Sequence, residues 1–330
     1  MKAIQFQAKG QVAVCDLPDP VAGPGQVLIR VRASGLCHTD IDVLHARYGA
    51  GAFPLVPGHE YAGEVLALGE GVTGFHKGQR VVVDPNLSCG SCRSCKRGRF
   101  NLCETLGAYG VSTNGGFAEL SVVDAFNLHD AGDLPFDQAA LAEPMACILN
   151  GVSALAPTPQ DEALVIGAGP IGMLLAIALR TRGVTDITLA DIDPQRLELA
   201  KSFGFKGIDS RGDMSRLRHS KDICADATGR AEVAGGMIDM LADGGRALFF
   251  GVCAPTARIE ISPFEIFRRQ LQLMGTHSLN RNIPEALAAI RAEGPQIARL
   301  VSHKVGLQDV AGFMQGHAPA GSLKIQVSFD

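Results

Sequence analysis

The sequence has no block of lysine and arginine residues and no long uninterrupted apolar segment. Its 34 Asp and Glu residues outnumber its 30 Lys and Arg residues, which gives a formal net charge of −4. This balance provides no electrostatic surface for nucleic acid or for an anionic membrane. The most apolar segment, residues 163–179, is just shorter than the roughly 18 residues typical of a membrane span, and glycines and a proline interrupt it. We therefore expect no nucleic-acid or membrane partner.

The N-terminal segment also lacks the features of an export signal. Residues 1–14, MKAIQFQAKGQVAV, alternate apolar and polar residues as a strand does, without an apolar core or a small-residue cleavage site. We therefore expect a cytoplasmic protein. In that compartment the nine cysteines would serve as metal ligands or buried thiols rather than as disulfides.

The distribution of short apolar segments predicts two kinds of domain in this chain of 330 residues. In residues 1–143, strand-like segments such as Val27–Ala33 and Arg80–Asp84 are separated by Gly and Pro turns, which indicates a β-rich domain. Residues 144–283 alternate strands with helices, as in a doubly wound parallel sheet of the α/β class. Residues 284–330 contain one helix and short apolar segments that could return to the first domain.

Four cysteines lie close together in the segment 89–103, with the spacing Cys-x-x-Cys-x-x-Cys-x7-Cys: Cys89, Cys92, Cys95 and Cys103. Four thiolates this close form a closed tetrahedral zinc site, which would fix a loop that has little core of its own. An iron–sulfur cluster also fits four thiolates, and spacing alone does not exclude it. A zinc ribbon that binds nucleic acid is disfavoured by the net charge and by the lack of aromatic residues beyond Phe100.

A second group of metal ligands comes from two separate segments. His59 and Glu60 are neighbours in the segment 58–72, GHEYAGEVLALGEGV, and Cys37 lies 22 residues before His59. Imidazole, carboxylate and thiol groups are all ligands that Zn²⁺ accepts, and three protein ligands leave a position open for substrate. A lone His or Cys would more often be structural. The prediction of a catalytic metal therefore depends on the whole glycine-spaced motif.

A glycine fingerprint follows a short apolar strand and precedes a helix in the second half of the chain. It has the pattern Gly-x-Gly-x-x-Gly and includes Gly167, Gly169, Pro170, Ile171 and Gly172. Glycines at these positions let the backbone approach a pyrophosphate that rests on the helix N-terminus. The setting between strand and helix is the one that a dinucleotide-binding site requires.

An acidic residue stands where the ribose of such a dinucleotide would bind. Asp191 comes nineteen residues after Gly172, at the end of the next strand, and a carboxylate there would bind the ribose 2′-hydroxyl and repel a 2′-phosphate. NAD is therefore expected rather than NADP, although Arg196 and Arg211 temper this preference because arginine can accept a phosphate. Residues that follow later strands would line the nicotinamide side of the crevice: Gly229, Gly251 and Val252.

Together these motifs resemble the zinc-dependent alcohol dehydrogenases of the medium-chain dehydrogenase/reductase family. The resemblance implies a GroES-like catalytic domain with two zinc sites, one catalytic and one structural, and a Rossmann domain that binds NAD. It also implies that Glu143, in the Glu-Pro pair that many polyol dehydrogenases carry, belongs to the catalytic site. Cys37 and His59 would be zinc ligands, and Glu60 and Glu143 would complete the shell directly or through water.

The resemblance assigns roles to three residues that follow Cys37. Thr39 would accept the hydrogen bond of the substrate hydroxyl and pass the proton onward. Asp42 stands where many relatives carry a histidine that ends the proton relay, so the exit route of the proton stays open. His38 would lie near the cofactor pyrophosphate or would be a solvated surface histidine.

The expected reaction is the reversible oxidation of a secondary alcohol to a ketone, with hydride transfer to NAD. The Glu-Pro pair favours a sugar alcohol, but the segment after Gly275 lacks the Arg-Tyr pair that is common in sorbitol dehydrogenases. L-Threonine 3-dehydrogenase and a simple secondary-alcohol dehydrogenase are alternatives. A nucleotide-sensing or structural protein on the same fold is disfavoured by the metal ligands. Family members are dimers or tetramers, so we expect a homo-oligomer.

Overall fold

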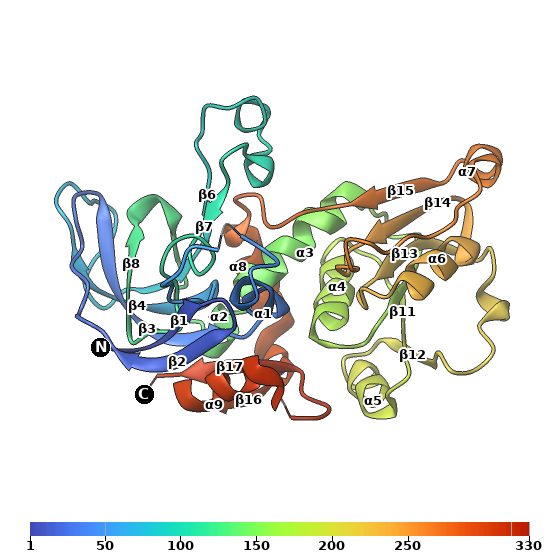
Figure 1. Ribbon diagram of the computed structural model, residues 1–330. Helices are drawn as coiled ribbons and strands as arrows, with labels where there is room; N and C mark the ends of the chain where they lie inside the picture. Colours follow the sequence, from blue (N-terminus) through green and yellow to red (C-terminus); the bar gives the residue numbers. More distant parts are fainter. Residues whose placement is uncertain (50, 318, 330) are drawn as a thin grey trace. The chain divides into compact units, whose positions relative to one another are not determined.

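The computed structural model describes residues 1–49, 51–317 and 319–329, and the chain forms two compact units (Figure 1). Unit 1 comprises Met1–Ala146 and Leu279–Asp330, and unit 2 comprises Cys147–Ser278. The sequence predicts the corresponding divisions after residues 143 and 283. Unit 2 is therefore inserted between two parts of unit 1.

Unit 1 is built on a sheet of seven strands. Its order is β16 (Val301–Val305), β17 (Lys324–Ser328), β3 (Gln26–Gly35), β4 (Glu60–Leu68), β5 (Arg80–Val83) and β9 (Leu128–Asp130), with β8 (Leu120–Asp124) also paired to β3. Strand β17 comes from the end of the chain and lies between β16 and β3. The C-terminal segment is therefore part of the interior of this sheet.

Alternating apolar residues explain why β3 forms here. Val27, Ile29 and Val31 are fully buried and pack in one cluster with Val65 of β4 and Val81 of β5. Successive side chains in a strand point to opposite faces, so every second residue enters the core. Strand β3 pairs antiparallel with both β4 and β17. At its end, Gly35 lies opposite Glu60, the first residue of β4, and opposite Gln326 of β17.

The remaining elements of unit 1 are two small sheets and short helices. The small sheets pair β1 (Lys2–Ala8) with β2 (Gln11–Asp16), and β6 (Asn86–Leu87) with β7 (Gly107–Ala108). The helices are α1 (His38–Leu44), α2 (Phe136–Ala139), α8 (Ile283–Glu293) and α9 (Leu307–Gly312). Between β6 and β7 the chain forms the four-cysteine lobe, residues 89–103, which contains two short 3₁₀ helices, Cys95–Arg97 and Phe100–Leu102.

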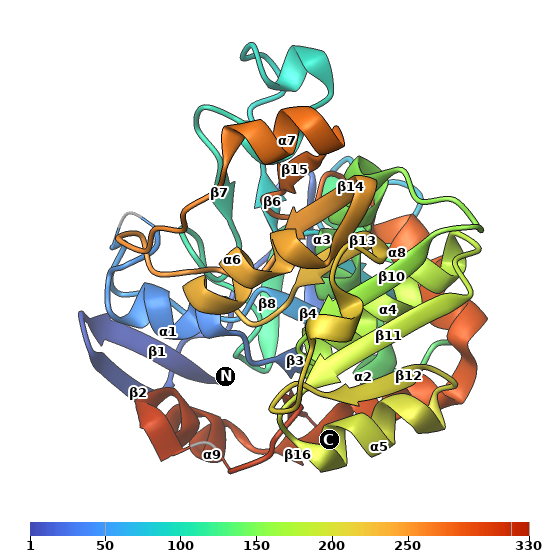
Figure 2. The same cartoon turned by 90° about the vertical axis from the view of Figure 1, so that its right-hand side faces the viewer.

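Unit 2 contains a parallel sheet of six strands, seen side by side in Figure 2. The order is β12 (Lys206–Asp209), β11 (Asp186–Asp191), β10 (Glu162–Ile166), β13 (Lys221–Asp226), β14 (Leu241–Phe249) and β15 (Gln272–Gly275). Helices α4 (Pro170–Thr181), α5 (Pro194–Ser202), α6 (Ala231–Met240) and α7 (Pro263–Arg269) pack on it. Helix α3 (Ala142–Leu155) begins in unit 1 and ends in unit 2. The predicted α/β class, a doubly wound sheet domain plus a β-rich domain, is confirmed.

Helix α4 accounts for the most apolar segment of the chain. Gly169 caps it, Pro170 is its first residue, and Met173–Leu179 are fully buried against β10 and β11. A Cβ atom at Gly172 would lie 1.7 Å from the carbonyl oxygen of Gly167, so only glycine permits this turn. Among the described residues, no helix combines the length and the apolar character needed to cross a membrane.

Candidate metal and cofactor sites

Three predicted ligands converge where α1 begins and β4 begins. Cys37 is the N-cap of α1, His59 immediately precedes β4, and Glu60 is its first residue. One ligand atom from each residue lies within 4.8 Å of the other two, and His59 and Glu60 are buried. A sulfur, an imidazole nitrogen and a carboxylate oxygen at this spacing fit the ligand preference of Zn²⁺.

A buried aspartate holds the two ligand-bearing segments together. Asp40 is fully buried; its Oδ2 accepts a hydrogen bond from the Cys37 backbone N–H at 2.9 Å, and its Oδ1 accepts one from the Gly58 N–H at 3.2 Å. The same Oδ1 lies 3.3 Å from Nδ1 of His59. Burial alone would lower the pKa of His59, but the Asp40 carboxylate and Cys37 outweigh it and raise that pKa well above its usual value. Asp40 therefore provides a negative charge in ion-pair range of the imidazole, although Nδ1 has no partner of hydrogen-bond geometry among the described residues.

Glu60 forms an ion pair with a lysine from the last strand of the sheet. Nζ of Lys324 lies 2.6 Å from each Glu60 carboxylate oxygen, and it also donates to the Leu36 carbonyl at 3.2 Å. Burial would lower the pKa of Lys324, but the negative charge of Glu60 and its neighbours raises it above its usual value. The lysine is therefore charged, and it offsets the charge of the buried carboxylate.

The space for the Glu60 carboxylate depends on a glycine. A Cβ atom at Gly35, the last residue of β3, would lie 2.2 Å from Oε2 of Glu60. That oxygen is buried and forms an ion pair with Lys324, but among the described residues no contact to it has hydrogen-bond geometry. A buried oxygen with an unused lone pair next to a thiol and an imidazole fits a metal ion.

Glu143 lies nearby but outside this group of three. It is buried in the first turn of α3, and its charge contributes to raising the pKa of Lys324. The structure therefore brings Cys37, His59 and Glu60 within 4.8 Å of one another and has Glu143 within electrostatic range of the lysine. The role of Glu143 as a metal ligand stays a prediction.

The other candidates around Cys37 follow it on helix α1. Oγ1 of Thr39 accepts a hydrogen bond from Sγ of Cys37 at 3.6 Å, so it borders the ligand cluster. Oδ1 of Asp42 accepts a hydrogen bond from Nε of Arg47 at 2.9 Å and lies 3.9 Å from Nε2 of the exposed His38. The predicted relay residue is therefore held in an ion pair with Arg47.

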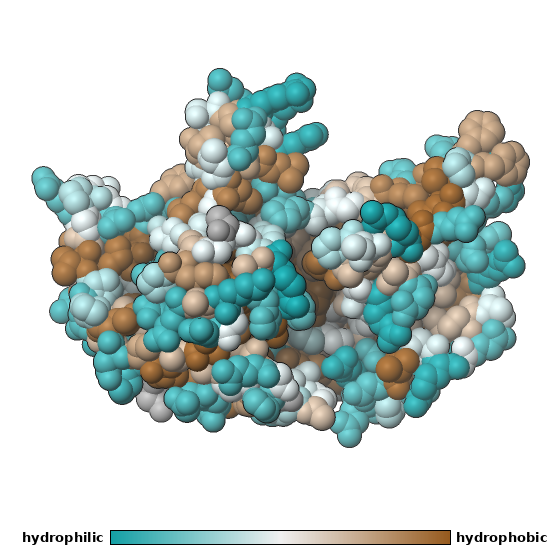
Figure 3. Space-filling model, in the orientation of Figure 1, coloured by the Kyte–Doolittle hydropathy of each residue, from teal (hydrophilic) through white to brown (hydrophobic). Residues whose placement is uncertain are grey.

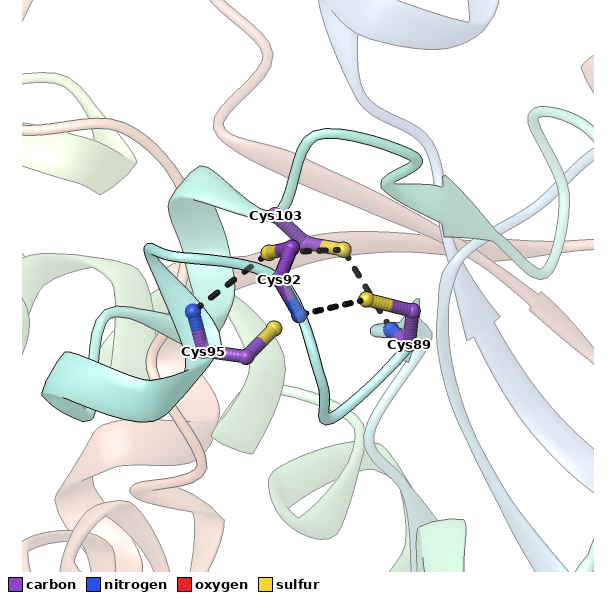
Figure 4. Close-up of side chains that lie close together, drawn as sticks. All are labelled: Cys89, Cys92, Cys95 and Cys103. Atoms are coloured by element: carbon purple, nitrogen blue, oxygen red, sulfur yellow. Dashed lines mark hydrogen bonds between the residues drawn. The ribbon is translucent and has the colours of Figure 1, made fainter.

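The four cysteines of the lobe point toward one another (Figure 4). Their sulfur atoms lie within 4.8 Å of one another, and backbone N–H groups donate to them, for example Cys92 N–H to Cys89 Sγ at 3.4 Å. Hydrogen bonds from the N–H groups of Ser91 and Cys92 lower the pKa of Cys89 to about 5. Burial raises the pKa of Cys95 to about 12. The four sulfurs offer a closed tetrahedral donor set, which fits a structural metal ion without a position for substrate.

Unit 2 has a cavity of about 620 Å³ at the carboxyl ends of its strands. Predicted cofactor residues line it: Gly167, Gly169, Pro170, Ile171, Asp191 and Arg196. Gly172 packs against Gly167, the first glycine of the motif. Gly229 packs against Val252, because a Cβ atom at Gly229 would lie 2.6 Å from the Val252 carbonyl oxygen. A Cβ atom at Gly251 would in turn lie 2.2 Å from the Gly229 nitrogen. The cavity lies where the strand order reverses between β10 and β13, which is the usual ligand position in such sheets.

Two opposite charges face this cavity at the end of β11. Oδ2 of Asp191 accepts a hydrogen bond from the Ala168 N–H at 2.6 Å, and Oδ1 accepts one from the Asp193 N–H at 2.9 Å. The guanidinium NH1 of Arg196 lies 3.8 Å from Oδ2, and its buried Nε has no hydrogen-bond partner among the described residues. The carboxylate favours ribose hydroxyls, whereas the guanidinium favours a phosphate.

Comparison with known proteins gives matches along both units. The sequence profile of the alcohol dehydrogenase GroES-like domain matches residues 23–133, and that of the zinc-binding dehydrogenases matches residues 170–292. D-altritol 5-dehydrogenase of Agrobacterium fabrum is 55% identical over 334 residues, covering 100% of this chain and 99% of that protein. An L-threonine 3-dehydrogenase of Rhizobium johnstonii is 31% identical, covering 94% and 93%. A zinc-binding dehydrogenase from Sinorhizobium meliloti, bound to NADP, has a TM-score of 0.95 at 29% identity, with 99% of each chain covered.

Proposed function

Because this chain belongs to the zinc-dependent medium-chain dehydrogenase/reductase family, whose members oxidise CH–OH groups, we propose that it converts a sugar alcohol to the ketose. The observation that carries this proposal is the 55% identity, along the whole chain, with a D-altritol 5-dehydrogenase. The cluster of Cys37, His59 and Glu60 supports it, because it offers the open metal site that such a reaction needs. We also propose a cytoplasmic location.

In the proposed reaction the substrate carbon loses a hydride to the nicotinamide, and the substrate hydroxyl loses a proton to solvent. A zinc ion bound by Cys37 and His59 would supply Lewis acidity that makes the hydroxyl easier to deprotonate. Thr39 accepts the hydroxyl hydrogen bond and begins the path of the proton. Asp40 holds the histidine in its orientation, and Lys324 holds the Glu60 carboxylate in its place within the cluster.

For the cofactor we propose NAD. The support is the carboxylate of Asp191 at the end of β11, which suits free ribose hydroxyls. Arg196 on the same cavity offers a site for a 2′-phosphate, and a similar protein binds NADP, so NADP is the alternative. The ratio of kcat/KM for the two cofactors decides between them.

We further propose two zinc ions per chain, one at the three-ligand cluster and one in the four-cysteine lobe. Metal analysis of the intact protein should give two zinc ions per chain, and both Cys92→Ser and His59→Ala should reduce the value to one. A protein with iron and labile sulfide in the lobe would instead indicate an iron–sulfur cluster.

The first experiment measures NADH formation with a panel of sugar alcohols, simple secondary alcohols and L-threonine, before and after chelation of zinc. Turnover of the sugar alcohols, lost on chelation and restored by Zn²⁺, is the expected result. Preference for L-threonine, the substrate in the name of a relative that is 31% identical, would assign the chain to that activity instead. Absence of turnover with every substrate, in protein that contains zinc and binds NAD, would remove the enzymatic assignment.

We propose a homo-oligomer that associates through the β15 edge of unit 2. Strand β15 is the last strand of its sheet, and the neighbouring helix α7 exposes Phe264 at 63% and Phe267 at 80%. Apolar residues gather at this end of the molecule (Figure 3). A second copy that pairs along β15 would cover them. The molecular mass in solution, compared with that of Phe267→Glu, tests this arrangement and separates a dimer from a tetramer.

A further inference from the structure

One side chain from the return segment after unit 2 holds the base of the four-cysteine lobe. Oδ1 of Asn280 accepts hydrogen bonds from the backbone N–H of Phe100 at 2.9 Å and of Asn101 at 3.4 Å. Its Nδ2 donates to the Gly98 carbonyl at 2.9 Å. The guanidinium of the next residue, Arg281, lies 3.3 Å from the centre of the Phe100 ring. The lobe is therefore attached to a segment that is 180 residues away in sequence.

A second asparagine connects this segment to helix α3. Oδ1 of Asn282 accepts a hydrogen bond from the backbone N–H of Asn280 at 3.0 Å. Its Nδ2 donates to the carbonyl oxygen of Ala146 at 2.7 Å. Ala146 is fully buried in α3. The side-chain amide of Asn282 is thus hydrogen-bonded both to Asn280, which binds the lobe, and to helix α3.

Helix α3 carries Glu143, one turn before Ala146. Residues three apart in a helix lie on the same side, so a group fixed to Ala146 also fixes the turn that contains Glu143. The charge of Glu143 acts on Lys324, which pairs with Glu60. Hydrogen bonds therefore connect the four-cysteine lobe to helix α3, and the charge of Glu143 on that helix acts on the lysine that pairs with Glu60. All of these residues belong to unit 1.

We propose that Asn280 and Asn282 are positioning residues that make the four-cysteine lobe a support for helix α3, and thereby fix Glu143 beside the catalytic metal site. This rests on the proposed function, since it gives the lobe a part in the reaction through the position of Glu143. Loss of a group that orients a metal site typically lowers activity by about 10- to 100-fold. A lobe that stabilised only itself would have no such effect.

Hydrogen–deuterium exchange of the zinc-loaded protein tests whether the lobe supports helix α3, and it does not require turnover. Asn280→Ala should speed exchange both in the lobe, residues 98–103, and in α3, residues 143–150. Asn282→Asp keeps the acceptor for the Asn280 N–H but cannot donate to Ala146, so it should speed exchange in α3 and leave the lobe unchanged. Asn282 is the N-cap of α8 but its side chain makes no capping hydrogen bond, so the substitution removes no such bond, and Asp is a common residue at this position.

Ser88→Ala is the matched control, because it removes the 3.1 Å hydrogen bond from Arg281 and leaves both asparagines in place. It should change exchange in neither α3 nor residues 98–103. An Asn280→Ala protein whose faster exchange stops at the lobe would overturn the proposal, as would a Ser88→Ala protein that behaves like it. These results are independent of the substrate, so they remain distinct from a failure of the proposed function.

Kinetic measurements then connect the exchange results to the reaction. Asn282→Asp should lower kcat by about tenfold with little change in the KM for NAD, because the cofactor cavity lies in unit 2. Unchanged kcat in a protein with faster exchange in α3 would refute the link to Glu143.

Discussion

The ammonium group of Lys324 lies 2.6 Å from both carboxylate oxygens of Glu60, although 264 residues separate them in the sequence. Both side chains are buried, with Lys324 5% exposed. The pair joins the start of β4 to the start of β17, on opposite sides of β3. The geometry of the ligand cluster therefore depends on the last strand of the chain.

Lys324→Met should destabilise the protein by about 3–5 kcal/mol, because it leaves the buried carboxylate of Glu60 without its cation. Urea unfolding measures the loss. Lys304 is the control, since it forms a 2.7 Å ion pair with Asp137 but its side chain is 52% exposed. Lys304→Met should cost less than about 1 kcal/mol. Equal losses in the two variants would contradict this account of the Lys324–Glu60 pair.

Gly35→Ala should displace the Glu60 carboxylate, because the added Cβ would lie 2.2 Å from Oε2. We expect zinc at the catalytic site to bind at least about tenfold more weakly, as measured by competition with a chelator. Gly312→Ala is the control: it has open space around the new Cβ and lies in helix α9. That substitution should be neutral or stabilise the helix by up to about 1 kcal/mol.

Asp84 should make the protein less stable as the pH rises through the mildly acidic range. Burial raises its pKa to about 6, above the roughly 3.9 of an unfolded chain, so between these values the folded state binds more protons. The free energy of unfolding should fall by about 2–3 kcal/mol from this group as the pH rises from 4 to 7.

Asp84→Asn removes this titration and can still accept the hydrogen bond from the Asn86 N–H, which is 3.0 Å long in the native protein. The variant should match the native protein near pH 4 and exceed its stability at pH 7.5, in urea titrations at both values. The exposed Asp133 provides the comparison, since Asp133→Asn should retain the native pH dependence. A stability gain that is the same at both pH values would rule out titration of Asp84 as the cause.

Asp191→Ser should shift the cofactor preference toward NADP. The change removes a carboxylate that repels a 2′-phosphate, and Arg196 remains on the same cavity to bind that phosphate. We expect kcat/KM for NADP to rise by about tenfold and that for NAD to fall. Adding Arg196→Ala should abolish the gain with NADP, and a gain that persists without the arginine would exclude it as the phosphate ligand.

The sequence predicted the features whose residues are close together in the chain. Four cysteines within 89–103 and three glycines beside one strand define their sites by spacing, because the backbone between them is short. Val27–Ala33 was likewise predicted as a strand, and it lies within β3. In each case a local pattern determines which side chains share a face.

The roles of Lys324 and Asp40 in the site could not be predicted from such local patterns. Lys324 reaches Glu60 only because β17 is in the same sheet as β4, and no periodicity in residues 324–328 indicates that pairing. The sequence also does not show that the Asp40 carboxylate meets the backbone N–H groups of both Cys37 and Gly58. Asparagines 280 and 282 lie outside every motif, and their hydrogen bonds appear only in three dimensions.

The position of β17 also constrains the order in which the protein is made. The strand lies inside the sheet of unit 1, next to β3, yet it is synthesised after all of unit 2. Unit 2 is complete in the nascent chain at Ser278, before the lysine that neutralises Glu60 has been synthesised. During translation unit 2 can fold first, whereas the sheet of unit 1 stays open until β17 has left the ribosome.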